Sequence, residues 1–294
     1  MSLWQWTHPI TDVIRRRFSC RTYRPDPIEA EMRQRLVRAA AALRSGPFGA
    51  ALRFRVVAAT EEDRRSLKGL GTYGFIRGAG GFFLGAVGRG ERNLEDFGYC
   101  MEELILFATD LGLGTCWLGG TFSKSAFAAR IRLQPEEVMP AVAAVGYIAE
   151  RRSLVDRVIR RSAKGDRRRP WEHLFFDEQF GRPLSRQDAG AYAEPLEMVR
   201  LGPSASNKQP WRIVRQGNAW HFYLQRTPGY LQGWDKHFVV ADLQRVDLGI
   251  ALCHFELTAR EVGLSGHWVL ADPALELPDD QTEYTATWME GTKG

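Results

Sequence analysis

The stretch LEDFGYCMEELILFATDLGLG (94–114) decides how this chain is organised, because it carries a long helical pattern that ends at Gly112 and Gly114. A second stretch of this kind, DLQRVDLGIALCHFELTAREVGLSG (242–266), also ends in glycines. Its segment AREVGL (259–264) matches ATDLGL (108–113) in the first. We therefore expect two long helices that form the core of the molecule, with the following side chains buried: Phe97, Leu104, Phe107, Leu252 and Phe255.

The segments around each long helix repeat one order: helix, strand, strand, long helix, glycine-rich cap, strand. The first half is predicted to hold a helix at 27–44, strands at 52–60, 80–88 and 115–120, and a buried strand at 140–149. The second half is predicted to hold a helix at 185–200, a strand pair at 211–225 and a strand at 267–271. The sequence therefore predicts an α+β fold of two tandem halves, 1–150 and 179–294, joined by a basic linker or arm at 151–178.

The composition is that of an ordinary globular protein, with 294 residues of which 44% are hydrophobic and 26% charged. No apolar run approaches the roughly 18 residues of a membrane span. The basic cluster near the N-terminus follows the apolar residues, which argues against a signal peptide. The histidines and the four cysteines (Cys20, Cys100, Cys116 and Cys253) show no metal-ligand spacing, so we expect reduced thiols, a cytoplasmic location and no metal site.

The net charge of +5 is concentrated in one segment. Residues 151–170 hold nine Arg or Lys against two Asp, which leaves −2 for the rest of the chain. A surface that binds nucleic acid more often spreads its basic residues along a face, among aromatic side chains. We interpret the segment as an exposed linker and expect no nucleic-acid partner; a basic arm that binds nucleic acid in a salt-sensitive way is the alternative.

Three separate segments carry residues suited to ligand binding. RRRFSCRTY (15–23) alternates guanidinium groups with a hydroxyl, which suits a phosphate monoester, although a solvated basic turn has the same pattern. GPSASNKQPW (202–211) offers small hydroxyl and amide side chains to a polar ring edge, although such runs also cap helices. GLGTCWLGGTF (112–122) holds four glycines that let a flat ring lie against the main chain, although helix ends are also rich in glycine.

Together, and in their order along the chain, these segments resemble those of the nitroreductase family of FMN enzymes. The resemblance implies that 15–23 holds the FMN phosphate and ribityl chain, that 202–211 contacts the isoalloxazine, and that 112–122 approaches the flavin N5 edge. It also implies that a basic pair before Pro170 meets the phosphate, without specifying which arginine of 167–169 does so. The residues that it assigns to FMN are Arg17, Phe18, Ser19, Arg21, Trp117, Leu118, Gly119, Gly120, Arg168, Arg169, Pro203, Ser204, Ala205, Ser206, Asn207 and Gln209.

The chain departs from the usual pattern of that family in one respect. Ordinary members carry the P-S-x-x-N loop soon after the first helix of every subunit, and two subunits exchange these loops to build two sites. Here the corresponding place reads RSGPFGA (44–50), and the intact loop occurs only in the second half, which in turn lacks an R-x-S-x-R segment. The resemblance therefore implies a fused, intramolecular pseudo-dimer, similar to a smaller subgroup of the family, with one complete and one vestigial flavin site. Since the fused halves already bury the usual dimer surface, we expect a monomer.

The resemblance implies an oxidoreductase that passes electrons from NAD(P)H through FMN to a small, flat, electron-poor acceptor such as a nitroaromatic or a quinone. No side-chain base is expected, so no residue is assigned a catalytic role. An FMN-binding protein with a sensory or storage role and little turnover is the alternative. The aromatic loop WDKHF (234–238) could line the pocket, but packing is the simpler interpretation.

Overall fold

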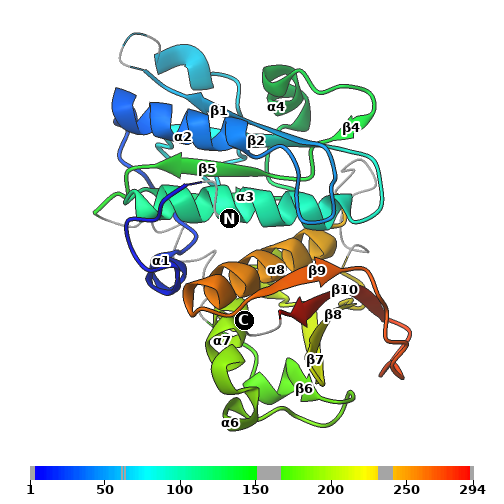
Figure 1. Cartoon of the computed structure of the whole chain (residues 1–294). Coiled ribbons are helices and arrows are strands. Elements are labelled where there is room, and N and C mark those ends of the chain that lie inside the picture. Colours follow the sequence, from blue (N-terminus) through cyan, green and yellow to red (C-terminus); the bar gives the residue numbers. More distant parts are fainter. Residues whose placement is uncertain (1–3, 61, 63, 151–166, 231–240, 292–294) are drawn as a thin grey trace.

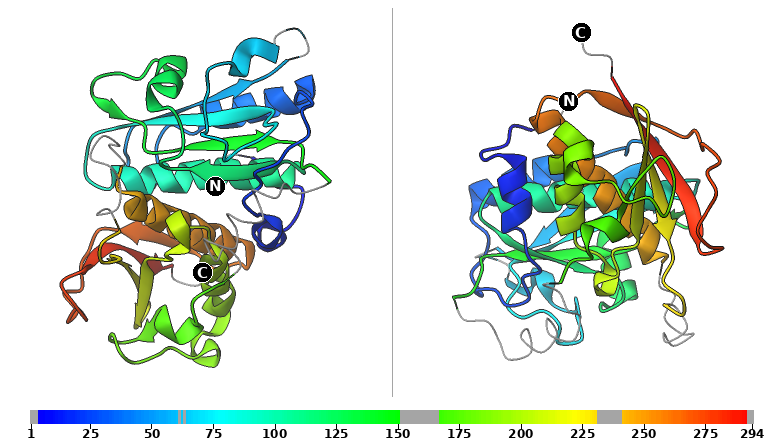
Figure 2. Two further views of the ribbon diagram at one scale, coloured as in Figure 1. Left: turned by 180° about the vertical axis from the view of Figure 1, so that it is seen from behind. Right: turned by 90° about the horizontal axis from the view of Figure 1, so that it is seen from below.

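The two long helices lie side by side between two sheets, in a computed structural model that describes residues 4–60, 62, 64–150, 167–230 and 241–291 (Figure 1). They are α3 (Asn93–Asp110) and α8 (Leu243–Glu261). Views from behind and from below show one sheet with its helices on each side of this helix pair (Figure 2). The predicted loop at 234–238 and residues 151–166 of the predicted arm fall outside the described residues.

The first half is built on an antiparallel sheet with the order β1-β2-β5-β3, in which β4 also pairs with β2. The central strand β2 reads GFFLGAVG, and almost all of it is buried because helices cover both faces of the sheet. Helices α2 and α3 pack on one face and α4 on the other. The elements are α1 (Ile10–Arg16), α2 (Ala30–Ala42), β1 (Leu52–Ala58), η1 (Arg64–Leu67), β2 (Gly81–Gly88), β3 (Gly114–Leu118), α4 (Lys124–Ile131), β4 (Glu137–Val138) and β5 (Val142–Gly146).

The second half is built on a sheet with the order β6-β7-β8-β10-β9, in which β6 and β7 are parallel and the other pairs antiparallel. One face of this sheet packs against α7 and α8 through an aromatic core. The elements are η2 (Trp171–His173), β6 (Phe175–Asp177), α6 (Arg186–Ala189), η3 (Gly190–Tyr192), α7 (Ala193–Leu201), η4 (Ala205–Asn207), β7 (Trp211–Gln216), β8 (Ala219–Gln225), β9 (Gly266–Val269) and β10 (Thr282–Glu290).

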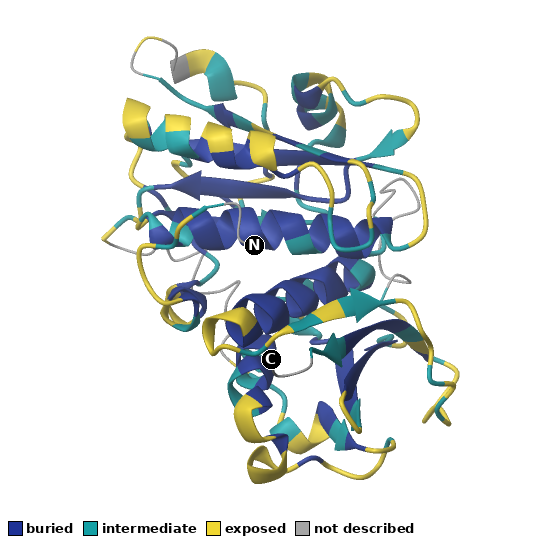
Figure 3. Cartoon of the chain, in the orientation of Figure 1, coloured by how far each residue is buried: buried dark blue, intermediate teal, exposed yellow. Residues whose placement is uncertain are grey.

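Helices α3 and α8 are buried along almost their whole length (Figure 3). Their backbones touch at two glycines: a Cβ on Gly98 would lie 2.1 Å from the carbonyl oxygen of Val246, and one on Gly249 would lie 2.0 Å from that of Glu95. Only glycine permits so close an approach. The register that matches 108–113 with 259–264 also aligns Gly98 with Gly249, so the two halves meet through equivalent positions.

The α+β fold with two tandem halves is confirmed, and all five predicted core side chains on the long helices are buried. Among the helices and strands, α1, α4, β4, β6 and β10 were not predicted. The predicted helix at 185–200 is interrupted, because Gly190 adopts a φ of 55° and ends α6 before α7 begins. No helix among the described ranges has the length and apolar character to cross a lipid bilayer.

Candidate functional site

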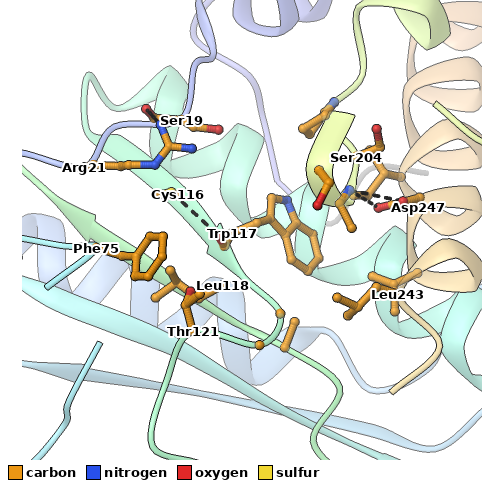
Figure 4. Close-up of a pocket in the computed structure, with 18 of the residues that line it drawn as sticks. Ser19, Arg21, Phe75, Cys116, Trp117, Leu118, Thr121, Ser204, Leu243 and Asp247 are labelled. Carbon is orange, nitrogen blue, oxygen red and sulfur yellow. Dashed lines mark hydrogen bonds between the residues drawn. The ribbon is translucent and has the colours of Figure 1, made fainter. Parts of the chain in front are cut away.

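A cavity of about 230 Å³ opens between the two halves. The first half contributes the extended segment after α1 and the end of β3, while the second half contributes the loop 203–206 and the first turns of α8 (Figure 4). Many residues assigned to FMN from the sequence line this one cavity: Ser19, Arg21, Trp117, Leu118, Gly119, Gly120, Pro203, Ser204, Ala205 and Ser206.

The extended segment after α1 runs along the edge of β3. Ser19 forms a parallel bridge with Thr115, and the N–H of Cys20 donates to the Thr115 carbonyl at 2.8 Å. Side chains alternate along an extended chain, so Cys20 points into the core, where it is 2% exposed. Ser19 and Arg21 consequently reach the cavity from the same side of the chain (Figure 4).

Trp117 is held in place by a buried polar cluster beneath the cavity. Its Nε1 donates to Oε2 of Glu102 at 2.6 Å, and Oε1 of Glu102 lies 3.0 Å from Nε2 of His254. The Nδ1 of His254 donates to the Met198 carbonyl, which can only accept. Arg17 belongs to this cluster and not to the cavity lining, since its Nε lies 3.7 Å from Glu102. The cluster joins the two halves and fixes the indole that forms one wall of the cavity.

Main-chain donors gather where β3 ends. Within the described residues, the N–H groups of Gly119, Gly120 and Thr121 donate no hydrogen bond to the protein, although all three residues line the cavity. Partly buried N–H groups normally have an acceptor. A Cβ on Gly119 would lie 2.4 Å from the Leu243 side chain, so this position brings the chain against α8. The arrangement leaves three consecutive donors for a bound molecule.

The loop 203–206 is tied to α8 by Asp247. Both carboxylate oxygens accept from the N–H of Ala205, at 3.0 and 3.1 Å, and Oγ of Ser204 accepts from the N–H of Gln209 at 2.8 Å. Burial raises the pKa of Asp247 well above its ordinary value, and it outweighs the lowering by the Ala205 hydrogen bond. The backbone is left-handed at Ser206 and, just after the loop, at Asn207 and Gln209; Asn adopts this conformation more readily than most residues, whereas it is uncommon for Ser and Gln.

The remaining residues assigned from the sequence lie around the cavity and not in its lining. Arg168 donates to Oδ1 of Asn207 at 3.4 Å, and the N–H of Arg169 donates to Oε1 of Gln209 at 2.8 Å, so these residues support the loop from behind. The Arg169 side chain lines a different cavity. Phe18 lines a small cavity beside Arg17, next to β3.

Several cavity residues escaped the sequence-based assignment, among them Phe75, Thr121, Tyr230, Leu243 and Asp247. The repeat did contain a signal for Asp247, because it aligns with Asp96 on α3. Asp96 accepts from two N–H groups of the corresponding first-half loop, those of Phe48 and Ala50, at 2.9 and 2.8 Å. No comparable signal marks Phe75 or Tyr230, which reach the cavity from loops.

Comparison with known proteins identifies the family. A family profile described as "Putative TM nitroreductase" matches residues 9–259. A putative nitroreductase from Thermotoga maritima is similar in structure over 98% of both chains, with 18% identity and a TM-score of 0.60. A putative nitroreductase from Desulfovibrio desulfuricans, in complex with FMN, matches over 51% of this chain and 94% of its own, with 25% identity and a TM-score of 0.37. A nitroreductase with bound FMN from Bacteroides fragilis matches over 50% of this chain and 92% of its own, with 21% identity and a TM-score of 0.38.

A search of curated protein sequences finds no match. The family profile nevertheless extends from the start of α1 through most of α8, and it therefore includes every segment that builds the cavity between the halves. The chain belongs to the putative TM nitroreductase family.

Proposed function

We propose that this chain binds one FMN in the cavity between its halves and passes electrons from NAD(P)H to a flat, electron-poor acceptor such as a nitroaromatic or a quinone. The observation that carries the proposal is the meeting of three distant segments on one cavity: Ser19 and Arg21, 117–120, and 203–206. The resemblance to nitroreductases had implied an FMN contact for each of these segments before they were seen to meet. Family membership and the full-length fold similarity are consistent with this chemistry.

The residues present suit the parts of FMN. Arg21 and Ser19 would hold the phosphate, since a guanidinium and a hydroxyl donate charge-assisted hydrogen bonds to its oxygens. The N–H groups of 119–121 would meet the polar edge of the ring. Apolar side chains from both halves, including Leu118 and Leu243, would cover the rest of the ring.

FMN, when bound, supplies the redox chemistry, and the protein supplies binding, orientation and electrostatics. The preorganised N–H donors of 119–121 would stabilise negative charge on the polar ring edge. Asp247 would keep the loop 203–206 closed against α8. Donor and acceptor would use the same open side of the cavity in turn, and no side-chain base is required.

We propose one FMN per chain because the first-half loop 44–50 packs differently from the second-half loop 203–206. Asp96 holds the loop 44–50 as Asp247 holds its counterpart, but Phe48 from this loop packs against the second-half core. The fused halves would thus replace a two-subunit site with one complete site in a monomer. The four cysteines are buried, free thiols, which fits our proposal of a cytoplasmic protein.

Comparing the affinities for FMN and riboflavin tests the phosphate assignment, because the two ligands differ only in the phosphate. A charge-assisted hydrogen bond is worth about 1.5–3 kcal/mol, so Arg21→Met should weaken FMN binding about 10- to 150-fold and leave riboflavin binding almost unchanged. Arg24→Met is the matched control, since Arg24 is exposed and pairs with Asp26 outside the cavity. The assignment would be contradicted if Arg21→Met and Arg24→Met lost FMN affinity to the same extent, or if neither variant lost FMN affinity.

A further inference from the structure

A second cavity, of about 350 Å³, lies on the face of the second-half sheet that is turned away from α8. Residues from η2, β6, β7, β8 and the loop before β10 line it, and these elements belong to the lower half of the molecule in Figure 1. Trp211 and Ile213 on β7 pack in the core with α8, so Arg212 between them extends to the opposite face. The two cavities share no lining residue.

Arg212 is a buried cation that forms no salt bridge within the described part of the chain, although the carboxylate of Asp279 is near enough to act on its charge. It is only 6% exposed, and its hydrogen bonds come from Nη1 alone, to the carbonyls of Gln209 at 3.0 Å and Trp211 at 2.6 Å. Among the described residues, no acceptor meets its Nε and Nη2 groups. Burial, and then the nearby Arg169, lower the pKa of Arg212 to about 10 against the raising effect of Asp279, so the group stays charged at neutral pH. Buried charges in proteins are ordinarily paired.

The other groups around the cavity favour an anion attached to an apolar ring. Arg169 brings a second guanidinium to the lining, and His173 and the Gln225 amide bring further polar groups. Phe176 and Phe180 supply aromatic surface. One carboxylate, that of the exposed Glu172, also lines the cavity, and Asp279 is bound by the Nε2 of Gln225.

We propose that this cavity binds a phosphate monoester carried on a planar ring. The Nε and Nη2 edge of Arg212 has the planar geometry that pairs with two oxygens of a phosphate, and Arg169 adds the second charge that a dianion needs. The phenyl rings of Phe176 and Phe180 take the flat part of the ligand. The site is separate from the proposed flavin cavity and does not depend on it.

Calorimetric titration of the full-length chain with phenyl phosphate and with inorganic phosphate, at constant ionic strength, tests this proposal. We expect the Arg21→Met chain, which lacks the proposed phosphate-binding arginine of the other cavity, to bind one phenyl phosphate, more tightly than inorganic phosphate. Arg212→Met should raise the dissociation constant at least about tenfold. Two control variants should leave it unchanged: Arg182→Met, an exposed arginine paired with Asp177, and Arg21→Met in the other cavity.

A second variant, Arg169→Met, keeps the proposal testable if Arg212→Met fails to fold. The side chain of Arg169 is half-buried; the substitution removes its Nε hydrogen bond to the Lys208 carbonyl at 3.3 Å but retains the main-chain N–H that holds Gln209. We expect this variant to weaken phenyl phosphate binding as well. The proposal is overturned by no binding at about 10 mM phenyl phosphate, by equal affinity in wild type and Arg169→Met, or by loss of binding in Arg21→Met. Equal affinities for the two phosphates would refute the aromatic part of the site.

Discussion

Replacing Asp247 with alanine removes the group that ties the loop 203–206 to α8. In the native chain both carboxylate oxygens accept from the N–H of Ala205, and the side chain is almost fully buried. A buried N–H left without its acceptor costs about 1–3 kcal/mol. Because this loop forms one wall of the cavity, we expect the substitution to destabilise, by this free energy, the conformation that binds FMN. The dissociation constant for FMN should rise about 5- to 150-fold.

Asp247→Asn is the matched control for this prediction. The amide keeps an oxygen that accepts from Ala205, and burial raises the pKa of Asp247, so a neutral side chain is tolerated better here than at an exposed position. FMN affinity should therefore stay within about threefold of wild type. Titration of FMN with each protein, followed by flavin fluorescence, measures both constants. An alanine variant that binds FMN as tightly as wild type would refute the reasoning that this contact positions the loop.

Three further predictions concern stability and are checked by urea unfolding. Burial raises the pKa of Asp96 to about 6, so its contribution to stability is fully present below its ordinary pKa of 3.8 and is lost as the pH rises through about 6. Asp96→Asn should therefore lose less stability than wild type between about pH 4 and 7, by up to about 3 kcal/mol; parallel pH profiles would contradict this. Gly98→Ala should cost about 1–3 kcal/mol or more at the helix contact, whereas Gly90→Ala, which has no atom within 4 Å of the new Cβ, should change stability by less than about 0.5 kcal/mol. Equal midpoints for these two glycine variants would count against the close helix packing. Glu102→Ala removes the acceptor of Trp117 Nε1 and the partner of His254, so it should cost about 3–5 kcal/mol, and a loss below about 1 kcal/mol would show that the cluster does not hold the halves together.

The long helices and central strands were predictable because the pattern of apolar residues in each segment matches the surface that the segment buries in the fold. Helical spacing with terminal glycines marks α3 and α8, and the apolar run of β2 marks a strand covered on both faces. β10 was missed because its residues, TEYTATWME, mix polar and aromatic side chains. Its strand conformation depends on pairing with both β8 and β9, which a local pattern does not reveal.

The candidate site was predictable where a residue type itself suits the proposed ligand. Ser19, Arg21 and the loop 203–206 were found in this way, and the structure brings them to one cavity. Asp247 was missed because its contact with the loop exists only in the folded chain. Arg169 was grouped with its neighbour Arg168 by sequence, but in the folded chain the Arg168 side chain contacts Asn207 and the Leu201 carbonyl, whereas Arg169 lines the second cavity.

The most direct test of the flavin assignment is the visible absorption spectrum of the purified chain after addition of FMN and desalting, followed by anaerobic addition of NADH or NADPH. We predict that about one FMN is retained per chain and that its yellow colour bleaches, faster with the preferred nucleotide. Retained colour that neither nucleotide bleaches would contradict turnover and favour a sensory or storage role. A chain that retains no flavin would contradict the central claim that the cavity between the halves is an FMN site.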